Sequence, residues 1–346
     1  MSDTHRFPVD QLQNTVQDIF IAVETPSHIA KIVAKILIGA NLAGHDSHGV
    51  LRVPAYLNQI EAGKLNPKAE PEIRVKTGTT LLVDGHFGFG HYMAHQGMNW
   101  AIEKAKQSNI SCVSFTNSTH IGRLGEYAEM AANAGCITLI TYGMGGASGS
   151  VVPFGGAKGA LGTNPLAVGI PTGTDAPFIL DFATSVVAEG KLQVARSKNA
   201  SVPEGYIVDS EGNTSTNPLD FYNGGYLLPI GGHKGYGLSL MTALLGGLGG
   251  NFKPEGGFAR GEMMQVINVE AFMPLETYQQ GAAAFLNQIK QTPPSTGFEQ
   301  VLVPGDPEHN LRQQRLTQGI DLPDTIKQQL QEVATHLNVS FPTGDQ

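Results

Sequence analysis

The sequence predicts a mixed α/β fold in which helices at both ends of the chain flank a central region of strands and helices. Apolar residues recur at helical spacing over residues 29–37 and again over residues 326–337. Between them, short apolar runs such as residues 110–116 are bounded by turn residues, which is typical of buried strands. The length of 346 residues and the 41% hydrophobic content suffice for two domains or one large α/β unit.

The first seventy residues are predicted to be mostly helical. The threonine-proline pair at 25–26 is typical of a helix start, with Thr25 as the N-cap and the proline in the first turn. A further helix follows residues 41–47, and Pro54 leaves two possible starts for it. A start at His48 would kink the helix at the proline, whereas a start near Arg52 would leave His48 in the preceding turn.

The central region alternates between predicted strands and predicted helices. The predicted strands cover residues 79–84, 110–116, 136–142, 166–170 and 178–182. The predicted helices cover residues 93–107, 124–134 and 237–246. The proline- and glycine-rich residues 291–297 are expected to form a linker, and Asp321-Leu322-Pro323 is expected to open the last helix.

Composition and charge exclude several classes of protein. A formal net charge of −8 without any lysine or arginine run argues against binding to nucleic acid. The N-terminus lacks an apolar signal core, and the long uncharged stretches are too rich in glycine to span a membrane. Cys112 and Cys136 do not form a ligand pair and fit a reducing compartment. We therefore expect a cytoplasmic protein that binds neither nucleic acid nor membrane.

The most informative segment is residues 45–52, His-Asp-Ser-His-Gly-Val-Leu-Arg. It sets the imidazole of His48 four residues before the guanidinium of Arg52 and next to the hydroxyl of Ser47. An imidazole can donate or accept a proton near neutral pH, and a guanidinium can bind a carboxylate through two parallel hydrogen bonds. The set predicts an enzyme that interconverts a carbonyl and an alcohol in a carboxylate-bearing substrate. A capping turn with two surface histidines is the alternative.

A glycine run at residues 143–149 follows a predicted strand and resembles a dinucleotide-binding fingerprint. Its third glycine comes one place late, the next residues are poor helix formers, and no acidic residue follows about twenty positions on. The sequence therefore argues against a Rossmann fold, and a nucleotide would have to be bound in another way.

The histidines raise the question of a metal site. Those considered are His45, His48, His86, His91, His95, His120 and His233. Zinc sites usually combine tight spacing with further cysteine, histidine or carboxylate ligands, and that combination is missing here. We expect no metal.

Four other polar segments lie at the ends of predicted strands or helices, where side chains and backbone amides point at ligands. They are residues 117–123, 162–165, 180–185 and 232–237. The last one combines Lys234 with a helix start and could hold a phosphate, although it lacks the spacing of a P-loop. Together the segments predict a polar site inside an apolar, glycine-rich shell.

Taken in order, these segments resemble the non-Rossmann malate/L-lactate dehydrogenase family over nearly the whole chain. That family also includes sulfolactate, ureidoglycolate and diketogulonate oxidoreductases and an imine-acid reductase, and the chain is most similar to the hydroxycarboxylate dehydrogenase B type. The matching motifs are residues 44–49, 117–122, 162–165, 180–185, 232–237, 304–306 and 315–320.

The resemblance implies a nicotinamide cofactor on a largely antiparallel or mixed sheet, a helical domain built from both termini, and a homodimer. The helical domain would comprise residues 1–75 together with 295–346, and the cofactor domain residues 76–294. NAD is the expected cofactor, with NADP possible. A 2′-phosphate could be met by Arg123, Lys191, Arg196 or Lys198.

The resemblance also implies roles for individual residues. His48 would be the proton donor, Arg52 the carboxylate clamp, Ser47 an assisting hydroxyl and Thr163 a substrate contact. We hypothesise that Asp181 is a carboxylate that raises the pKa of His48. The residues implied to line the cofactor are His120, Ile121, Gly122, Arg123, Asp181, Phe182, Ala183, Thr184, Ser185, His233, Lys234, Asn268, Pro304, Gly305, Asp306 and Pro307.

Departures from the family pattern put individual contacts with the cofactor in question. Tyr206 stands where the family often has tryptophan, and Asp306 and Pro307 depart from a glutamate-rich loop. The resemblance does not identify the substrate, because malate, lactate, 2-oxoglutarate and aryl pyruvates share the same carboxylate and carbonyl. The alternatives are a cyclic imine-acid reductase or ureidoglycolate-type enzyme of the same family, a metal-dependent hydrolase, and a non-catalytic carboxylate-binding protein.

Overall fold

The computed structural model describes residues 4–146, 149–250, 252 and 258–344. Its centre is a seven-stranded sheet with one parallel pair, β3–β4, and otherwise antiparallel neighbours. In spatial order the strands are β2 (Glu72–Lys76), β3 (Thr80–Asp84), β4 (Ile110–Thr116), β11 (Phe258–Asn268), β5 (Cys136–Gly145), β6 (Leu166–Ile170) and β7 (Phe178–Phe182). This mixed sheet confirms the expected non-Rossmann fold class.

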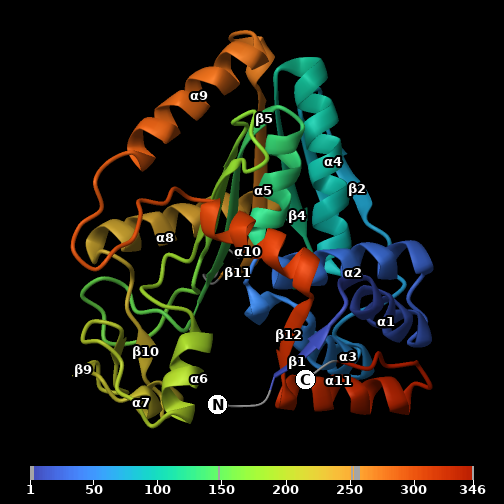
Figure 1. Ribbon diagram of the computed structural model, residues 1–346, viewed down its shortest axis with the longest axis vertical. Coiled ribbons are helices and arrows are strands. Elements are labelled where there is room, and N and C mark those ends of the chain that lie inside the picture. The colour runs from blue at the N-terminus through green and yellow to red at the C-terminus, as the bar shows by residue number, and fades with distance from the viewer. Residues whose placement is uncertain (1–3, 147–148, 251, 253–257, 345–346) are drawn as a thin grey trace.

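Helices pack on both faces of the sheet (Figure 1). α4 (Gly90–Ser108) and α5 (Leu124–Asn133) cover one face and bury a core with Ile140, Met264 and Val266. α8 (His233–Gly246) covers the other face at very close range. A Cβ at Gly143 would collide with the backbone of α8, so this glycine serves helix–sheet packing and not a pyrophosphate. Ala147 and Ser148 of the same glycine-rich run lie outside the described residues.

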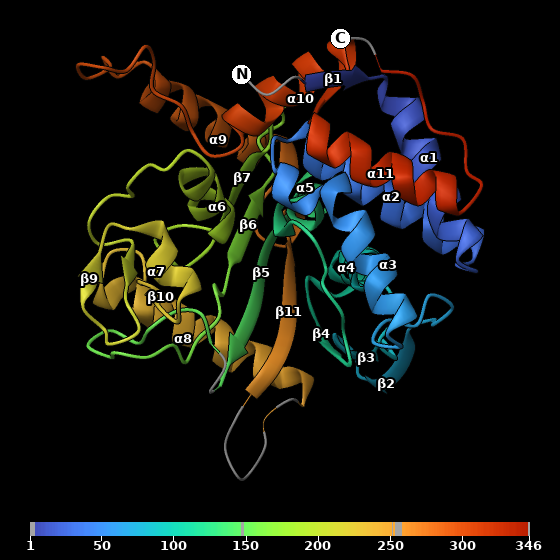
Figure 2. The same ribbon diagram turned by 90° about the horizontal axis from the view of Figure 1, so that it is seen from below.

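Both ends of the chain share a second core, and the helices that build it lie beside the sheet in Figure 2. β1 (Thr4–Phe7) pairs with β12 (Ile320–Pro323), and Phe7, Leu12, Ile320 and Leu330 are fully or almost fully buried in it. The helices of this part are α1 (Val9–Ala22), α2 (Ser27–Leu42), α3 (Val53–Glu61), α10 (Asp306–Gln318) and α11 (Asp324–His336). The division into two domains and its boundaries stay a prediction.

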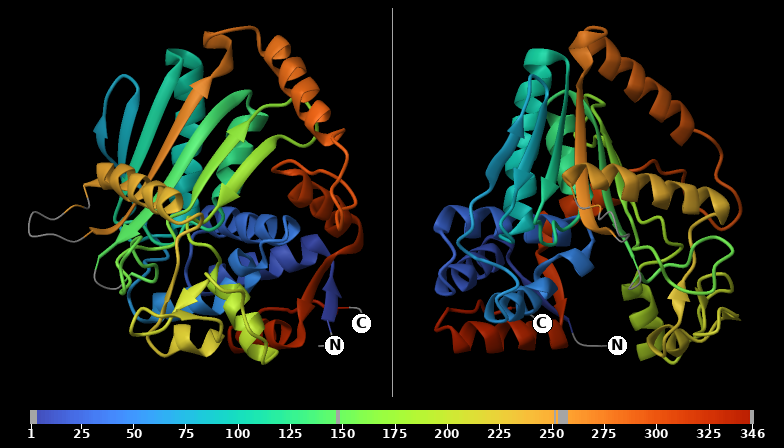
Figure 3. Two further views of the ribbon diagram at one scale, coloured as in Figure 1. Left: turned by 90° about the vertical axis from the view of Figure 1, so that its left-hand side faces the viewer. Right: turned by 180° about the vertical axis from the view of Figure 1, so that it is seen from behind.

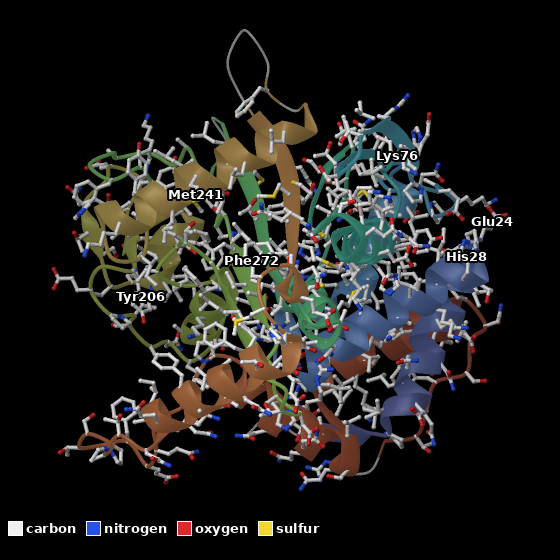
Figure 4. The ribbon with its side chains drawn as sticks, turned by 90° about the horizontal axis from the view of Figure 1, so that it is seen from above. Glu24, His28, Lys76, Tyr206, Met241 and Phe272 are labelled. Carbon is white, nitrogen blue, oxygen red and sulfur yellow. The ribbon has the colours of Figure 1, made fainter. Side chains whose placement is uncertain are left out.

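A third, smaller core lies between residues 151 and 227. It is built from β8 (Ile207–Val208), β9 (Thr214–Ser215), β10 (Tyr226–Leu227), α6 (Glu189–Ser197) and α7 (Pro218–Tyr222). Tyr206 packs against this core, and it lies far from Glu24 and His28 at the other side of the molecule (Figure 4).

The predicted strands at 110–116, 166–170 and 178–182 are confirmed with their bounds. α8 begins four residues earlier than predicted. Residues 321–323 form part of β12, so the last helix begins only after them. At the start of α2, Pro26 occupies the N-cap and no side chain caps the helix. No helix in the described part of the chain is both long and apolar enough to cross a membrane.

Candidate active site

The segment with His48 and Arg52 is a pair of short 3₁₀ turns. η1 (Asp46–His48) and η2 (Val50–Arg52) precede α3, which begins at Val53 with Pro54 in its first turn. Proline is well tolerated there, because the first amides of a helix have no partner within it. The later of the two predicted helix starts is therefore correct, and His48 lies in the preceding turn.

Side chains from α2 and α10 hold this segment in place. The amide of Asn41 accepts a hydrogen bond from the backbone N–H of Val50 at 2.9 Å and donates one to Asp46 at 2.6 Å. Arg315 forms an ion pair with Asp46 at 2.8 Å and donates to the carbonyl of Asn41. A Cβ at position 49 would overlap the amide of Asn41, so glycine is required there.

His48 is half-buried in a cationic environment. Its Nδ1 is 3.0 Å from the hydroxyl oxygen of Ser47, and its ring stacks on His120 with 5.5 Å between the centroids. Burial, followed by the nearby cations with Arg52 first, lowers the pKa of His48 to about 4. The imidazole is therefore neutral at pH 7 and ready to accept a proton.

Arg52 keeps its terminal nitrogens available. Its Nε donates to the carbonyl of Ser47 at 2.7 Å, and it has no ion pair with any residue that the structure describes. The guanidinium is half-buried and lies close enough to His48 to lower its pKa. This arrangement suits a carboxylate, which two guanidinium nitrogens can bind together.

A second set of polar side chains lies next to His48. No pattern in the sequence groups these residues together. The hydroxyl of Tyr56 is 2.7 Å from Nδ1 of His120 and 3.3 Å from Nε2 of His91. Burial lowers the pKa of His91 to about 3 and that of His120 well below its ordinary value. The only signal in the sequence is that Tyr56 follows Arg52 by one helical turn.

The structure corrects the hypothesis that Asp181 raises the pKa of His48. The carboxylate of Asp181 accepts the backbone N–H of Gly125 at 2.7 Å and lies 3.9 Å from Arg123. The pKa of His48 is lowered, by burial and cations, and not raised. Asp181 therefore holds the start of α5. Arg123 is itself buried and bonded to Glu129 at 3.0 Å, so it is not free for a 2′-phosphate.

The turn at residues 162–165 ties the sheet to α8. Asn164 accepts the backbone N–H of Met144 at 2.8 Å and donates to Ser239. The hydroxyl of Thr184 donates to the carbonyls of Thr163 and Asn164. These polar residues are therefore engaged in structural hydrogen bonds, and only the Thr163 side chain is partly exposed.

The start of α8 has the features of a phosphate-binding site. Ile230 donates its backbone N–H to the carbonyl of Thr184 at 2.8 Å, which brings residues 181–185 next to His233 and Lys234. The first amides of a fourteen-residue helix and the exposed ammonium of Lys234 together suit a pyrophosphate. The donor set therefore fits the dinucleotide that the resemblance implies.

Other predicted site residues are spread more widely. The loop at 304–307 packs against the start of β7, and Asp306 forms an ion pair with Lys290 at 2.7 Å. Asn268 lies at the far end of β11 from His120, where it accepts the N–H of Glu270. The structure does not bring Asn268 near the stacked rings of His48 and His120. Among the described residues, no three His, Cys, Asp or Glu side chains group closely enough to hold a metal ion.

Comparisons with known proteins agree with this architecture. The profile of the malate/L-lactate dehydrogenase family matches residues 7–331. A malate dehydrogenase from Pyrococcus horikoshii is 38% identical over 96% of this chain and 96% of its own length. Hydroxycarboxylate dehydrogenase B from Escherichia coli K12 is 36% identical over 93% of this chain and 91% of its own.

Solved structures give the same result. A malate dehydrogenase from Entamoeba histolytica superposes with a TM-score of 0.92 at 30% identity, covering 99% of this chain and 100% of that one. A delta1-piperideine-2-carboxylate reductase from Pseudomonas syringae superposes with a TM-score of 0.84 at 28% identity, covering 96% and 100%. The match spans both the histidine segment and the mixed sheet, and the chain belongs to the malate/L-lactate dehydrogenase family of oxidoreductases.

Proposed function

We propose that this protein is an NAD(P)-dependent 2-hydroxy-acid dehydrogenase in which His48 carries the proton and Arg52 binds the substrate carboxylate. The observation that carries the proposal is the pairing of a neutral, half-buried imidazole with an adjacent guanidinium whose terminal nitrogens have no ion-pair partner among the described residues. Family membership supports an enzyme that acts on hydroxy acids. It leaves no support for a metal-dependent hydrolase.

The chain's own residues would handle the proton and the carboxylate. A bound nicotinamide supplies or accepts the hydride at C2 of the substrate. Neutral His48 would accept the hydroxyl proton during oxidation and return it to the carbonyl oxygen during reduction. Ser47 would orient the ring through the 3.0 Å contact at Nδ1. A carboxylate on Arg52 would offset the cation that lowers the pKa of His48 and so favour protonation for reduction.

For the cofactor we propose NAD, held by the start of α8, with NADP as the alternative. Lys234 and the first amides of α8 would bind the pyrophosphate, next to residues 181–185. Two of the four cations considered for a 2′-phosphate are engaged elsewhere. Arg123 is paired with Glu129, and Arg196 lies 4.3 Å from the ring centre of Tyr222.

We further propose a homodimer that uses α9 (Leu275–Lys290) and the outer side of α8. α9 has no buried residue although Tyr278, Ala282, Phe285 and Ile289 share one face. Phe272 is 74% exposed and Leu244 is 62% exposed. Figure 3 shows both helices on the same side of the sheet. Exposed apolar surface of this extent is typical of an interface.

We also propose a cytoplasmic location. The two cysteines are free thiols, which supports it.

The test is a panel of 2-oxo acids and cyclic imine acids, monitored by the loss of NADH or NADPH absorbance. Wild type is compared with His48→Ala and Arg52→Ala, with Lys64→Ala as a variant of an exposed residue outside the site. We expect turnover to collapse in His48→Ala and KM to rise in Arg52→Ala. Turnover of the imine alone would favour a reductase of the piperideine-carboxylate kind. Undiminished turnover in His48→Ala would refute the proposed proton carrier.

A further inference from the structure

The first half of β11 places Arg260 and Glu262 on one face of the sheet. Arg260, Gly261 and Glu262 pair in unbroken register with Met144, Gly143 and Tyr142 of β5. Successive residues of a strand face opposite sides, so Arg260 and Glu262 share a face and Gly261 has the other. Gly261 lies against Gly246 of α8, which fixes the assignment. Arg260 therefore faces the side of the sheet that α4 and α5 cover.

This face of β11 contacts the loop that carries His120, whose ring stacks on His48. We refer to His48 and His120 as the histidine pair. The side chain of Glu262 is fully buried, and its two oxygens lie 2.7 and 2.8 Å from the hydroxyl of Ser118. Ser118 belongs to the loop that carries His120 two residues later. Arg260 lies two residues before Glu262 in the strand, directly after an irregularity in the β5–β11 pairing. This order places Arg260 next to Glu262 on the face that contacts the loop of His120.

Electrostatics agree with this placement. Arg52 and Arg260 both contribute to the lowered pKa of His120. Arg52 comes from the helical part and Arg260 from the sheet, so two cations flank the stacked imidazoles from different elements. Arg260 also lies close enough to Tyr142 to affect its pKa.

Arg260 is half-buried and has no hydrogen-bond or ion-pair partner within the described part of the chain. Apart from Arg52, the arginines around the site are engaged, since Arg123 and Arg312 bind Glu129 and Arg315 binds Asp46. Glu262 lies close enough for Arg260 to counteract part of the rise in its pKa, but the two side chains form no hydrogen bond or ion pair. A partly desolvated guanidinium whose nitrogens are not taken up by such a contact is suited to bind an anion that arrives from solution.

We propose that Arg260 binds a second anionic group of the substrate, at the end away from the carboxylate on Arg52. The inference rests on the proposed function and narrows it to 2-oxo and 2-hydroxy acids whose far end carries a carboxylate or a sulfonate. A substrate of this kind would span from Arg52 to Arg260 and present its C2 oxygen to the histidine pair between them. Arg260 is thus a specificity-determining residue.

The test compares Arg260→Gln with wild type on oxaloacetate, 3-sulfopyruvate and pyruvate. Loss of a charge-assisted contact predicts that KM for a dianionic substrate rises about 10- to 100-fold. KM for pyruvate should stay within about twofold. Arg260→Lys keeps the charge without the planar fork and should give an intermediate rise for oxaloacetate. A rise for only one of the two dianions would identify which group the site takes.

Lys76→Gln is the matched control for the loss of one positive charge. Lys76 is exposed on the edge strand β2, three strands away from β11 (Figure 4). It should leave all three KM values unchanged, because separated surface charges are screened by salt. Equal rises for pyruvate and oxaloacetate in Arg260→Gln, or a rise in KM for NADH instead, would overturn the proposal.

Equilibrium binding separates this proposal from the proposed function. Tartronate carries a hydroxyl and two carboxylates, and lactate carries a hydroxyl and one. Calorimetric titration should show that Arg260→Gln loses affinity for tartronate about 10-fold or more and keeps its affinity for lactate. If wild type reduces no 2-oxo acid, the proposed function fails while this titration still decides the role of Arg260. If wild type reduces pyruvate and both titrations are unchanged in the variant, only the role of Arg260 fails.

Discussion

The hydroxyl oxygen of Tyr56 lies 2.7 Å from Nδ1 of His120, so a side chain of α3 supports the second imidazole of the site. The side chain of Tyr56 is buried, and His120 is half-buried. Tyr56→Phe should therefore lower the free energy of unfolding by about 1 kcal/mol, because it removes the hydrogen bond between the hydroxyl and the ring nitrogen of His120.

Urea unfolding and steady-state kinetics check this expectation together. Because His120 stacks on His48, we expect kcat to fall along with stability. Tyr92→Phe is the control, since the hydroxyl of Tyr92 accepts a hydrogen bond from the side chain of Gln96 at 3.0 Å and touches no histidine of the site. Equal and small effects of both substitutions would mean that the Tyr56 hydroxyl has no special role.

Substrate binding should draw a proton from solvent onto His48. The pKa of His48 is about 4 in the free protein, with the cation of Arg52 as a cause second to burial. A bound carboxylate offsets that cation and raises the pKa of His48 toward neutrality, so protons are taken up near pH 6. Oxamate can serve as a non-reducible ligand, titrated by calorimetry in buffers of different ionisation enthalpy. His48→Gln should abolish the uptake, and proton release by wild type would contradict the prediction.

Asp46→Asn should loosen the segment that carries His48 and Arg52. Asp46 is bonded to both Asn41 and Arg315, and its neutral amide would weaken the 2.8 Å ion pair. Displacement of positioned groups is costly for catalysis, and we expect kcat/KM to fall about 10-fold. Asp321→Asn breaks an exposed ion pair with Arg6 and should change kcat/KM little. Equal activity of the two variants would show that Asp46 does not position the site.

The parts of the fold that the sequence could predict are those determined locally. The strands at 166–170 and 178–182 are short apolar runs between turns, and their bounds are as predicted. β11 escaped prediction because Arg260, Glu262 and Gln265 interrupt its apolar pattern. It lies between β4 and β5, which come more than a hundred residues earlier, and only that long-range pairing makes it a strand.

The residues of the site also fall into those that a local pattern predicts and those that only long-range contacts bring together. His48 and Arg52 lie within one short segment, so the sequence alone could indicate their joint role. The contacts of Tyr56 with His91 and His120 join three elements that are far apart in the chain, and no local pattern predicts them. Asp181 was expected to act on His48 because only its residue type was known, whereas its partners are Gly125 and Arg123.

Charge substitution on α9 should prevent the proposed dimer. Phe285 is 61% exposed on the apolar face of α9, and a glutamate there would place a charge in the interface. Light scattering should give twice the chain mass of 36.7 kDa for wild type and the single mass for Phe285→Glu. Phe87→Glu is the control, because Phe87 is 53% exposed on a turn outside this surface. A monomeric wild type would refute the proposed dimer.

Glu262→Gln should stabilise the protein at alkaline pH. Burial raises the pKa of Glu262 to about 7, above its ordinary 4.5, so the native state favours the protonated carboxyl. The stability that this preference contributes is complete below pH 4.5 and is lost as the pH rises through 7. The glutamine keeps an oxygen for the hydroxyl of Ser118 and never ionises, and above pH 7 it should be more stable than wild type by about 3 kcal/mol.

Urea midpoints measured between pH 4.5 and 8 test this expectation. The slope of stability against pH should become shallower in Glu262→Gln without vanishing, because burial also raises the pKa of Glu126 to about 7. Glu204→Gln removes an exposed carboxylate and should leave the slope as it is in wild type. If Glu262→Gln also leaves the slope unchanged, Glu262 is already ionised in the native protein. The hydroxyl of Ser118 would then be donating to a carboxylate buried two residues from Arg260.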